Sequence, residues 1–193
     1  MIDKREAACR QIECAIRLVA SPEDEFAVHT LAMAAFGILK DLAAAYDPDY
    51  EVKFKPFFTR IGWSRLTKTS NFLKHANKDP LGVFDSFDPR ENDWAIGFSL
   101  LLYRSVQGNL TPTMAAFHCW MVIRHPDEFQ IAEDADKDFE QLYRNSIRTL
   151  SEQGRDVETF LLNSLIDAYQ KGIIPPETGF LRRSQQEREN QFL

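Results

Sequence analysis

The sequence predicts an all-α protein, an up-and-down helical bundle of about six or seven helices. Apolar residues recur at helical spacing in several long stretches. Capping residues and prolines precede these stretches, glycines and prolines follow them, and no stretch alternates as a strand would. With 193 residues, 44% of them hydrophobic, the chain suits one domain with a sizeable core. We therefore expect a single helical domain over residues 1–174 and a polar tail over residues 175–193.

Two helices are predicted in the N-terminal part. The first covers residues 3–20, and its apolar stripe is Ala8, Ile12, Ala15, Ile16 and Val19. Ser21 then predicts a cap and Pro22 the first position of a second helix. That helix continues to about Tyr46, where Asp-Pro-Asp closes it.

The rest of the chain predicts a basic helix, a loop and four further helices. The basic helix runs from about residue 56 to 76 with a possible interruption at Gly62, and residues 77–89 form the loop. Glycine or proline ends three of the four later helices. The second of these four helices is apolar on every side, which is typical of a central helix. These helices cover residues 89–107, 114–124, 139–150 and 156–171.

Composition restricts the class of protein and its compartment. A net charge of -6 argues against a general nucleic-acid coat protein, so only a local patch would hold phosphates. The three cysteines have no metal-type spacing, and we interpret them as free thiols in a reducing cytosol. Charged residues begin at Asp3 with no apolar stretch behind them, which predicts no signal peptide. No window approaches the roughly 18 apolar residues of a membrane span, so we expect a cytoplasmic protein without a membrane partner.

One segment departs from the acidic character of the chain. Residues 53–78 hold seven basic side chains and no acidic one: Lys53, Lys55, Arg60, Arg65, Lys68, Lys74 and Lys78. Projected on one helix, five polar residues fall on a stripe about 22 Å long. They are Arg60, Ser64, Lys68, Asn71 and His75. Apolar residues, Phe72 among them, fill the opposite arc and are expected to face the core.

This stripe combines the groups that bind and cleave a phosphodiester. We predict anion binding by Arg60, Ser64, Lys68 and Lys74, because lysine and arginine hold phosphates. The candidate catalytic residues are His75, Asn71 and Lys68, since metal-free RNA cleavage needs an imidazole as acid or base beside a cation. The alternative is that the cations form only a solvated helix face. No cofactor is predicted.

The spacing around His75 resembles the HEPN superfamily of bacterial defence, toxin and RNA-processing proteins. The motif of that superfamily is an arginine, a polar residue, a short spacer and a histidine. Aligned on His75, Asn71 takes the polar position and Ser70 the arginine position. The resemblance covers about residues 1–125 and implies a core of four or five helices, a homodimer, and nuclease activity that the serine has weakened or removed. Residues 29–42 and 71–80 also look like a group of uncharacterised bacterial proteins.

Two other classes of function remain open. Glu25 with His29, or His75 with Asp79, would each offer two metal ligands on one face, but no metal site is predicted. A non-enzymatic interaction module is the other alternative, for example one half of a defence or toxin–antitoxin pair. It would engage its partner through the acidic residues 127–140 or the tail 175–193. Glycine-rich phosphate loops and nucleophile motifs are absent from the sequence.

Overall fold

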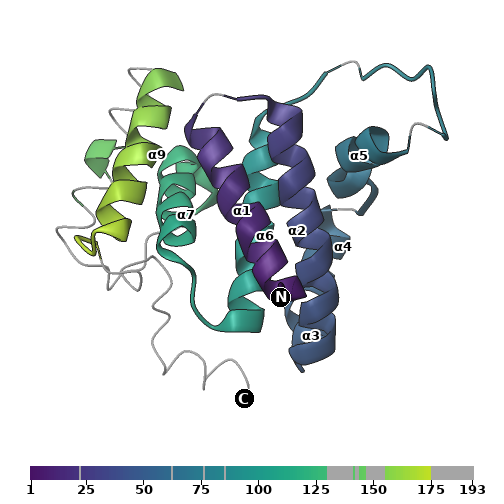
Figure 1. The fold of residues 1–193 in the computed structure, drawn as a ribbon, viewed down its shortest axis with the longest axis horizontal. Coiled ribbons are helices and arrows are strands. Elements are labelled where there is room, and N and C mark those ends of the chain that lie inside the picture. Colours follow the sequence, from purple (N-terminus) through teal and green to yellow (C-terminus); the bar gives the residue numbers. More distant parts are fainter. Residues whose placement is uncertain are drawn as a thin grey trace. The chain divides into compact units, whose positions relative to one another are not determined.

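The computed structural model describes residues 1–21, 23–61, 63–75, 77–84, 86–129, 141, 144–146 and 155–174. These residues contain eight α-helices, one 3-10 helix and no strand, which confirms the all-α class (Figure 1). Contacts divide the chain into two compact units, Met1–Leu110 and Thr111–Leu193, and each is described by itself. The tail 175–193 and most of the acidic segment lie outside the described residues.

In the first unit, three long helices build the core. They are α1 (Lys4–Ala20), α2 (Glu25–Tyr46) and α6 (Arg90–Gln107), and each contacts the other two (Figure 1). The helices meet through apolar faces, and the stripe predicted for α1 is buried except at Val19, which is half-buried. Fully buried side chains on these faces include Ile12, Ile16, Phe36, Leu39, Ile96 and Leu102.

Asp24, rather than Ser21, caps the start of α2. The Asp24 carboxylate accepts a hydrogen bond of 2.9 Å from the Ala27 amide, whereas Ser21 ends α1 with its own amide bonded to the Arg17 carbonyl. The expected cap at Ser21 is therefore wrong by three residues. A carboxylate at this position also interacts favourably with the positive end of the helix dipole, which a serine hydroxyl does not.

Residues 50–74 form three helices instead of the single basic helix that was predicted. They are α3 (Tyr50–Lys53), α4 (Lys55–Ile61) and α5 (Trp63–Lys74). Gly62, the expected interruption, stands between α4 and α5 but is outside the described residues. These additional short helices explain why the described residues contain more helices than the six or seven expected.

Helix α2 is long and apolar enough to cross a membrane, judged by length and composition alone. Its best 18-residue window has a mean hydropathy of 1.4. This finding corrects the expectation that no window of the sequence comes near a membrane span. The alanines of α2 raise the mean hydropathy of the window, although the helix has no unbroken run of large apolar residues. About half of this window, 44%, is buried inside the structure. A core helix of a soluble protein passes the same test.

The second unit is built on α7 (Pro112–Arg124) and α9 (Arg155–Gln170), with a 3-10 turn at Pro126–Glu128. Thr111 caps α7 through a hydrogen bond of 3.4 Å from the Met114 amide, so the helix starts two residues before the predicted Met114. Almost all of α7 is buried, in agreement with its apolar sequence. The Trp120 ring donates a hydrogen bond of 3.0 Å to the Glu158 carbonyl, and Arg124 pairs with the Glu158 carboxylate.

Candidate functional site

Three of the five polar residues of the predicted stripe lie on the solvent side of α5. Ser64, Lys68 and Asn71 are exposed on this helix, and Lys74 is exposed at its last position. The chain turns directly afterwards, and Lys78 is exposed in that turn. We call Lys68, Asn71, Lys74 and Lys78 together the basic surface.

The buried side chains that the structure describes on α5 are polar, which the sequence did not predict. Thr67, Thr69 and Ser70 are 7%, 1% and 4% exposed, whereas Phe72, expected to face the core, is 37% exposed. The Thr69 hydroxyl donates a hydrogen bond of 2.8 Å to Glu91 on α6. Small hydroxyl side chains let α5 approach its neighbours closely while their polar atoms stay paired. The helix is therefore rotated relative to the predicted orientation.

Phe72 packs instead against the loop between α5 and α6. Its ring centroid lies 4.9 Å from that of Phe84, and the Phe84 ring also meets Phe26 of α2 at 6.3 Å. The Lys68 ammonium lies 5.4 Å from the centroid of the same Phe84 ring. A cation above an aromatic face is weakly attracted, so the loop is attached to the exposed side of α5.

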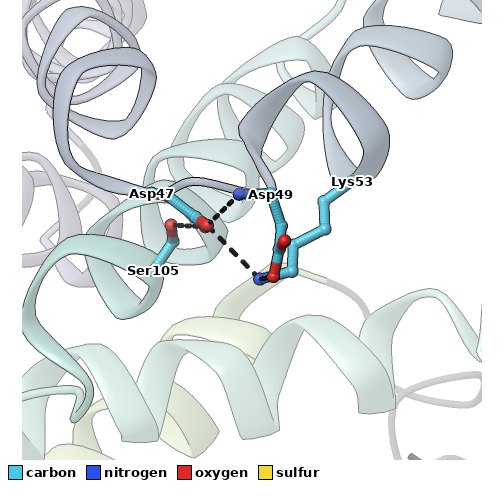
Figure 2. Close-up of polar contacts among 4 residues, drawn as sticks. All are labelled: Asp47, Asp49, Lys53 and Ser105. Carbon is cyan, nitrogen blue, oxygen red and sulfur yellow. Dashed lines mark hydrogen bonds and ion pairs between the residues drawn. The ribbon is translucent and has the colours of Figure 1, made fainter.

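Two of the seven basic residues are neutralised by acids at the end of α2 and in α3. The Lys53 ammonium lies 3.4 Å from Asp47 and 3.1 Å from Asp49, and Lys55 lies 2.6 Å from Glu51 (Figure 2 shows the Lys53 contacts). These cations contribute little attraction for an external anion. Arg60 and Arg65 lie in α4 and α5, but their side chains are outside the described part of the chain.

The lysines of the basic surface differ from Lys53 and Lys55. Lys68, Lys74 and Lys78 form no ion pair with any residue that the structure describes. Three exposed cations that form no ion pair with a described residue leave a local positive field on an acidic protein. Their positions at the C-terminal half of α5 and in the turn after it place that field at one end of the helix.

His75 lies just after α5, at the edge of the basic surface. Its backbone amide donates a hydrogen bond of 3.1 Å to the Asn71 carbonyl, and its carbonyl accepts a hydrogen bond of 2.9 Å from the Lys78 backbone amide. The side chain is half-buried. The side-chain amide of Asn71 donates a hydrogen bond of 3.3 Å to the Thr67 hydroxyl, and this bond fixes the orientation of the Asn71 side chain. The structure thus places His75, Asn71 and Lys78 in consecutive turns, while Ser70 faces the interior and donates to the Thr67 carbonyl.

Asp47 forms a second polar cluster, which the sequence analysis did not single out. Its side chain is 7% exposed and accepts hydrogen bonds from the Ser105 hydroxyl at 2.5 Å and the Asp49 amide at 2.9 Å (Figure 2). Burial alone would raise the pKa of Asp47, but these bonds and the Lys53 charge outweigh it, and the pKa is lowered. The Asp47 carboxylate has its hydrogen-bond partners within the cluster, so we interpret the cluster as a structural link between the end of α2 and α6.

His29 is the most unusual polar residue in the first unit. It is 2% exposed, and its Nδ1 lies 3.1 Å from the Asn92 amide oxygen. Burial lowers the pKa of His29, a Lys74 charge lowers it further, and the Asn92 bond and Glu91 oppose the shift. The other ring nitrogen, Nε2, is buried without a partner among the described residues. From the sequence, His29 was considered only as a metal ligand together with Glu25, and Asn92 was not predicted as its partner.

The described residues contain no group of three or more His, Cys, Asp or Glu side chains that could hold a metal ion. Cys9, Cys14 and Cys119 are free thiols, as expected. Comparisons with models of known protein families, with curated proteins and with solved structures find no match. The chain is an all-helical protein.

Proposed function

We propose that this protein binds a phosphate-bearing ligand, with RNA foremost, on the basic surface of α5. The observation that carries the proposal is that Lys68, Lys74 and Lys78 are exposed and unpaired within the described residues of a chain with a net charge of -6. Phosphate oxygens accept charge-assisted hydrogen bonds from ammonium groups. Asn71, on the same surface, supplies a further polar contact.

The HEPN resemblance favours RNA as the ligand. In that superfamily the residue aligned with Ser70 is an arginine that helps to hold the phosphate. Here Ser70 is 4% exposed and bonded to the Thr67 carbonyl, so this position faces away from the basic surface. Lys68 supplies a cation but lacks the bidentate fork of a guanidinium. These features favour binding over cleavage, with His75 adjoining the ligand.

The proposal is tested by RNA binding as a function of salt. Fluorescence anisotropy of a labelled single-stranded RNA should show weaker binding for Lys68→Ala/Lys74→Ala. Because each phosphate contact on a single strand contributes about −0.7 to the slope of log K against log salt, the slope of the double variant should be less negative by about 1.4.

A matched control removes two lysines that already have acidic partners. Lys55 pairs with Glu51 and Lys171 with Asp167, and all four side chains are largely exposed. The variant Lys55→Ala/Lys171→Ala changes the net charge by the same amount and should bind RNA nearly as the unaltered protein does. Equal losses in the two double variants would show that only overall charge matters and would remove the basic surface as the site.

A further inference from the structure

The exposed side of α5 carries an aromatic ring among its polar groups. Phe72 is 37% exposed, and Lys68 and Asn71, which precede it on the same helix, are also exposed. His75 follows Phe72, and its backbone amide continues the helical hydrogen bonding by donating to the Asn71 carbonyl. Residues at i, i+3, i+4 and i+7 of a helix share one face. Lys68, Asn71, Phe72 and His75 therefore combine a cation, an amide, a ring and an imidazole on one face.

The Phe84 ring fixes the position of Phe72. The two ring centroids are 4.9 Å apart with their planes inclined by 45°, and Phe84 also contacts Phe26 of α2 at 6.3 Å. Aromatic pairs at such separations attract each other beyond the effect of burial. Phe84 covers only part of Phe72, because 37% of that residue stays accessible to solvent. A ring that is both anchored and accessible loses little conformational freedom when it receives a planar partner.

Two cations lie near this ring. The Lys68 ammonium is 5.4 Å from the centroid of the ring that anchors Phe72, and Lys74 is exposed at the end of the helix. Neither lysine forms an ion pair with any residue that the structure describes. Asp79, exposed in the turn after α5, offsets the charge of Lys78. The attraction for a phosphate beside the ring therefore comes from Lys68 and Lys74.

An unpaired nucleic-acid strand presents phosphates and free base faces together. In a duplex the bases are stacked on one another, whereas a single strand offers bases that can stack on aromatic side chains. Proteins that bind single strands combine a cationic surface for the backbone with such aromatic platforms. We infer that the ligand of the basic surface is a single-stranded RNA, with one base stacked on Phe72 and neighbouring phosphates held by Lys68 and Lys74. This inference rests on the proposed function and narrows its ligand to an unpaired strand.

Two probes with the same phosphates separate stacking from charge. A labelled oligoadenylate carries bases, and a labelled abasic strand of equal length does not. Fluorescence anisotropy with the full chain should show at least about fivefold weaker binding of the abasic strand, because even weak stacking of one base contributes this much. Phe72→Leu keeps an apolar side chain against Phe84 but has no aromatic face. It should weaken oligoadenylate binding by a similar factor and leave binding of the abasic strand unchanged.

Further variants distinguish stacking from a loss of charge or of folding. Phe72→Trp supplies a larger aromatic face and should bind oligoadenylate at least as tightly as the unaltered protein. Because stacking releases no counterions, Phe72→Leu should leave the slope of log K against log salt unchanged, in contrast to Lys68→Ala/Lys74→Ala. Phe160→Leu, at a phenylalanine 71% exposed on α9, is the matched control and should bind oligoadenylate normally.

The outcomes separate this inference from the proposed function. Equal affinity of the unaltered protein for oligoadenylate and the abasic strand would overturn base stacking and leave phosphate binding in place, and this comparison needs no variant. Oligoadenylate binding that Phe72→Leu leaves unchanged would overturn the assignment to Phe72, as would tighter binding of a duplex than of the single strand. Absence of binding to either strand would remove the proposed function and this inference together.

Discussion

The His29 imidazole donates from Nδ1 to the amide oxygen of Asn92, 3.1 Å away and 63 positions later in the chain. Only this direction is open, because an amide oxygen accepts and cannot donate. Asn92 is itself fixed by a 2.9 Å hydrogen bond from its amide nitrogen to the Glu25 carbonyl. The bond therefore selects the tautomer of His29 that leaves Nε2 unprotonated inside the unit.

The first prediction concerns the pH dependence of stability through His29. Its pKa in the folded state lies below the ordinary 6.5, so between these two values the unfolded chain binds more protons than the folded one. Stability contributed by neutral His29 is therefore complete above pH 6.5 and falls as the pH decreases, by at most about 1.4 kcal/mol per pH unit. Urea unfolding at a series of pH values should show this loss.

His29→Gln is the matched variant for this prediction, because an amide does not titrate in this range. Its unfolding free energy should be nearly flat between pH 7 and 5 apart from the contribution of other groups. A second variant, Lys74→Gln, removes a charge that lowers the pKa of His29, so the folded-state pKa should move towards 6.5 and the total loss of stability should be smaller. An unaltered pH profile in His29→Gln would contradict the assignment.

The second prediction concerns the Asp47 cluster. Replacing Ser105 by Ala removes the 2.5 Å hydrogen bond to the Asp47 carboxylate, and Asp47→Ala also leaves the Asp49 amide without its acceptor. We expect losses of about 1–3 kcal/mol in the unfolding free energy, larger for Asp47→Ala. Because the pKa of Asp47 is lowered, the stability it contributes is present above its ordinary value of 3.8 and is lost as the pH falls below that value. Equal stability of Asp47→Ala and the parent chain at pH 7 would exclude this tie between α2 and α6.

The third prediction concerns thiol reactivity in the second unit. Burial raises the pKa of Cys119 to about 12, and a hydrogen bond with Tyr169 offsets this only in part. Since the thiolate is the reactive form, Cys119 should resist maleimide labelling in the folded protein and react after denaturation. Mass spectrometry of labelled peptides gives the comparison, with half-buried Cys14 as the internal reference. Rapid labelling of Cys119 in the folded protein at neutral pH would contradict the burial of its thiol.

The fourth prediction compares two glycines. Gly108 ends α6 with a φ of 85°, so Gly108→Ala should destabilise the first unit by about 1–2 kcal/mol. Gly37 lies inside α2, where an added Cβ would meet nothing within 4 Å, so Gly37→Ala should stabilise it by about 0.5–1 kcal/mol. Opposite shifts in the chemical unfolding midpoint are expected. Shifts of the same sign would contradict one of the two backbone assignments.

Part of the candidate site was available from local sequence. Lys53 and Lys55 each stand four residues after an acid, Asp49 and Glu51, and such pairs form on a helix. These partners lie just before residue 53 in the chain, so the basic segment attracts anions less strongly than its own composition indicates. Lys68, Lys74 and Lys78 remain as the part of the prediction that the structure leaves exposed.

The sequence by itself determined the all-α class, the α6 boundaries, the end of α7 at Arg124 and the helix end before Gly172, because periodicity, capping and glycine conformation act within a few residues. Only the tertiary structure decided which face of α5 is buried. That choice depends on Glu91 accepting from Thr69 and on Phe84 receiving Phe72, and both partners come from another part of the chain. The pairing of His29 with Asn92 has the same origin, since contacts between distant positions follow from how whole helices pack.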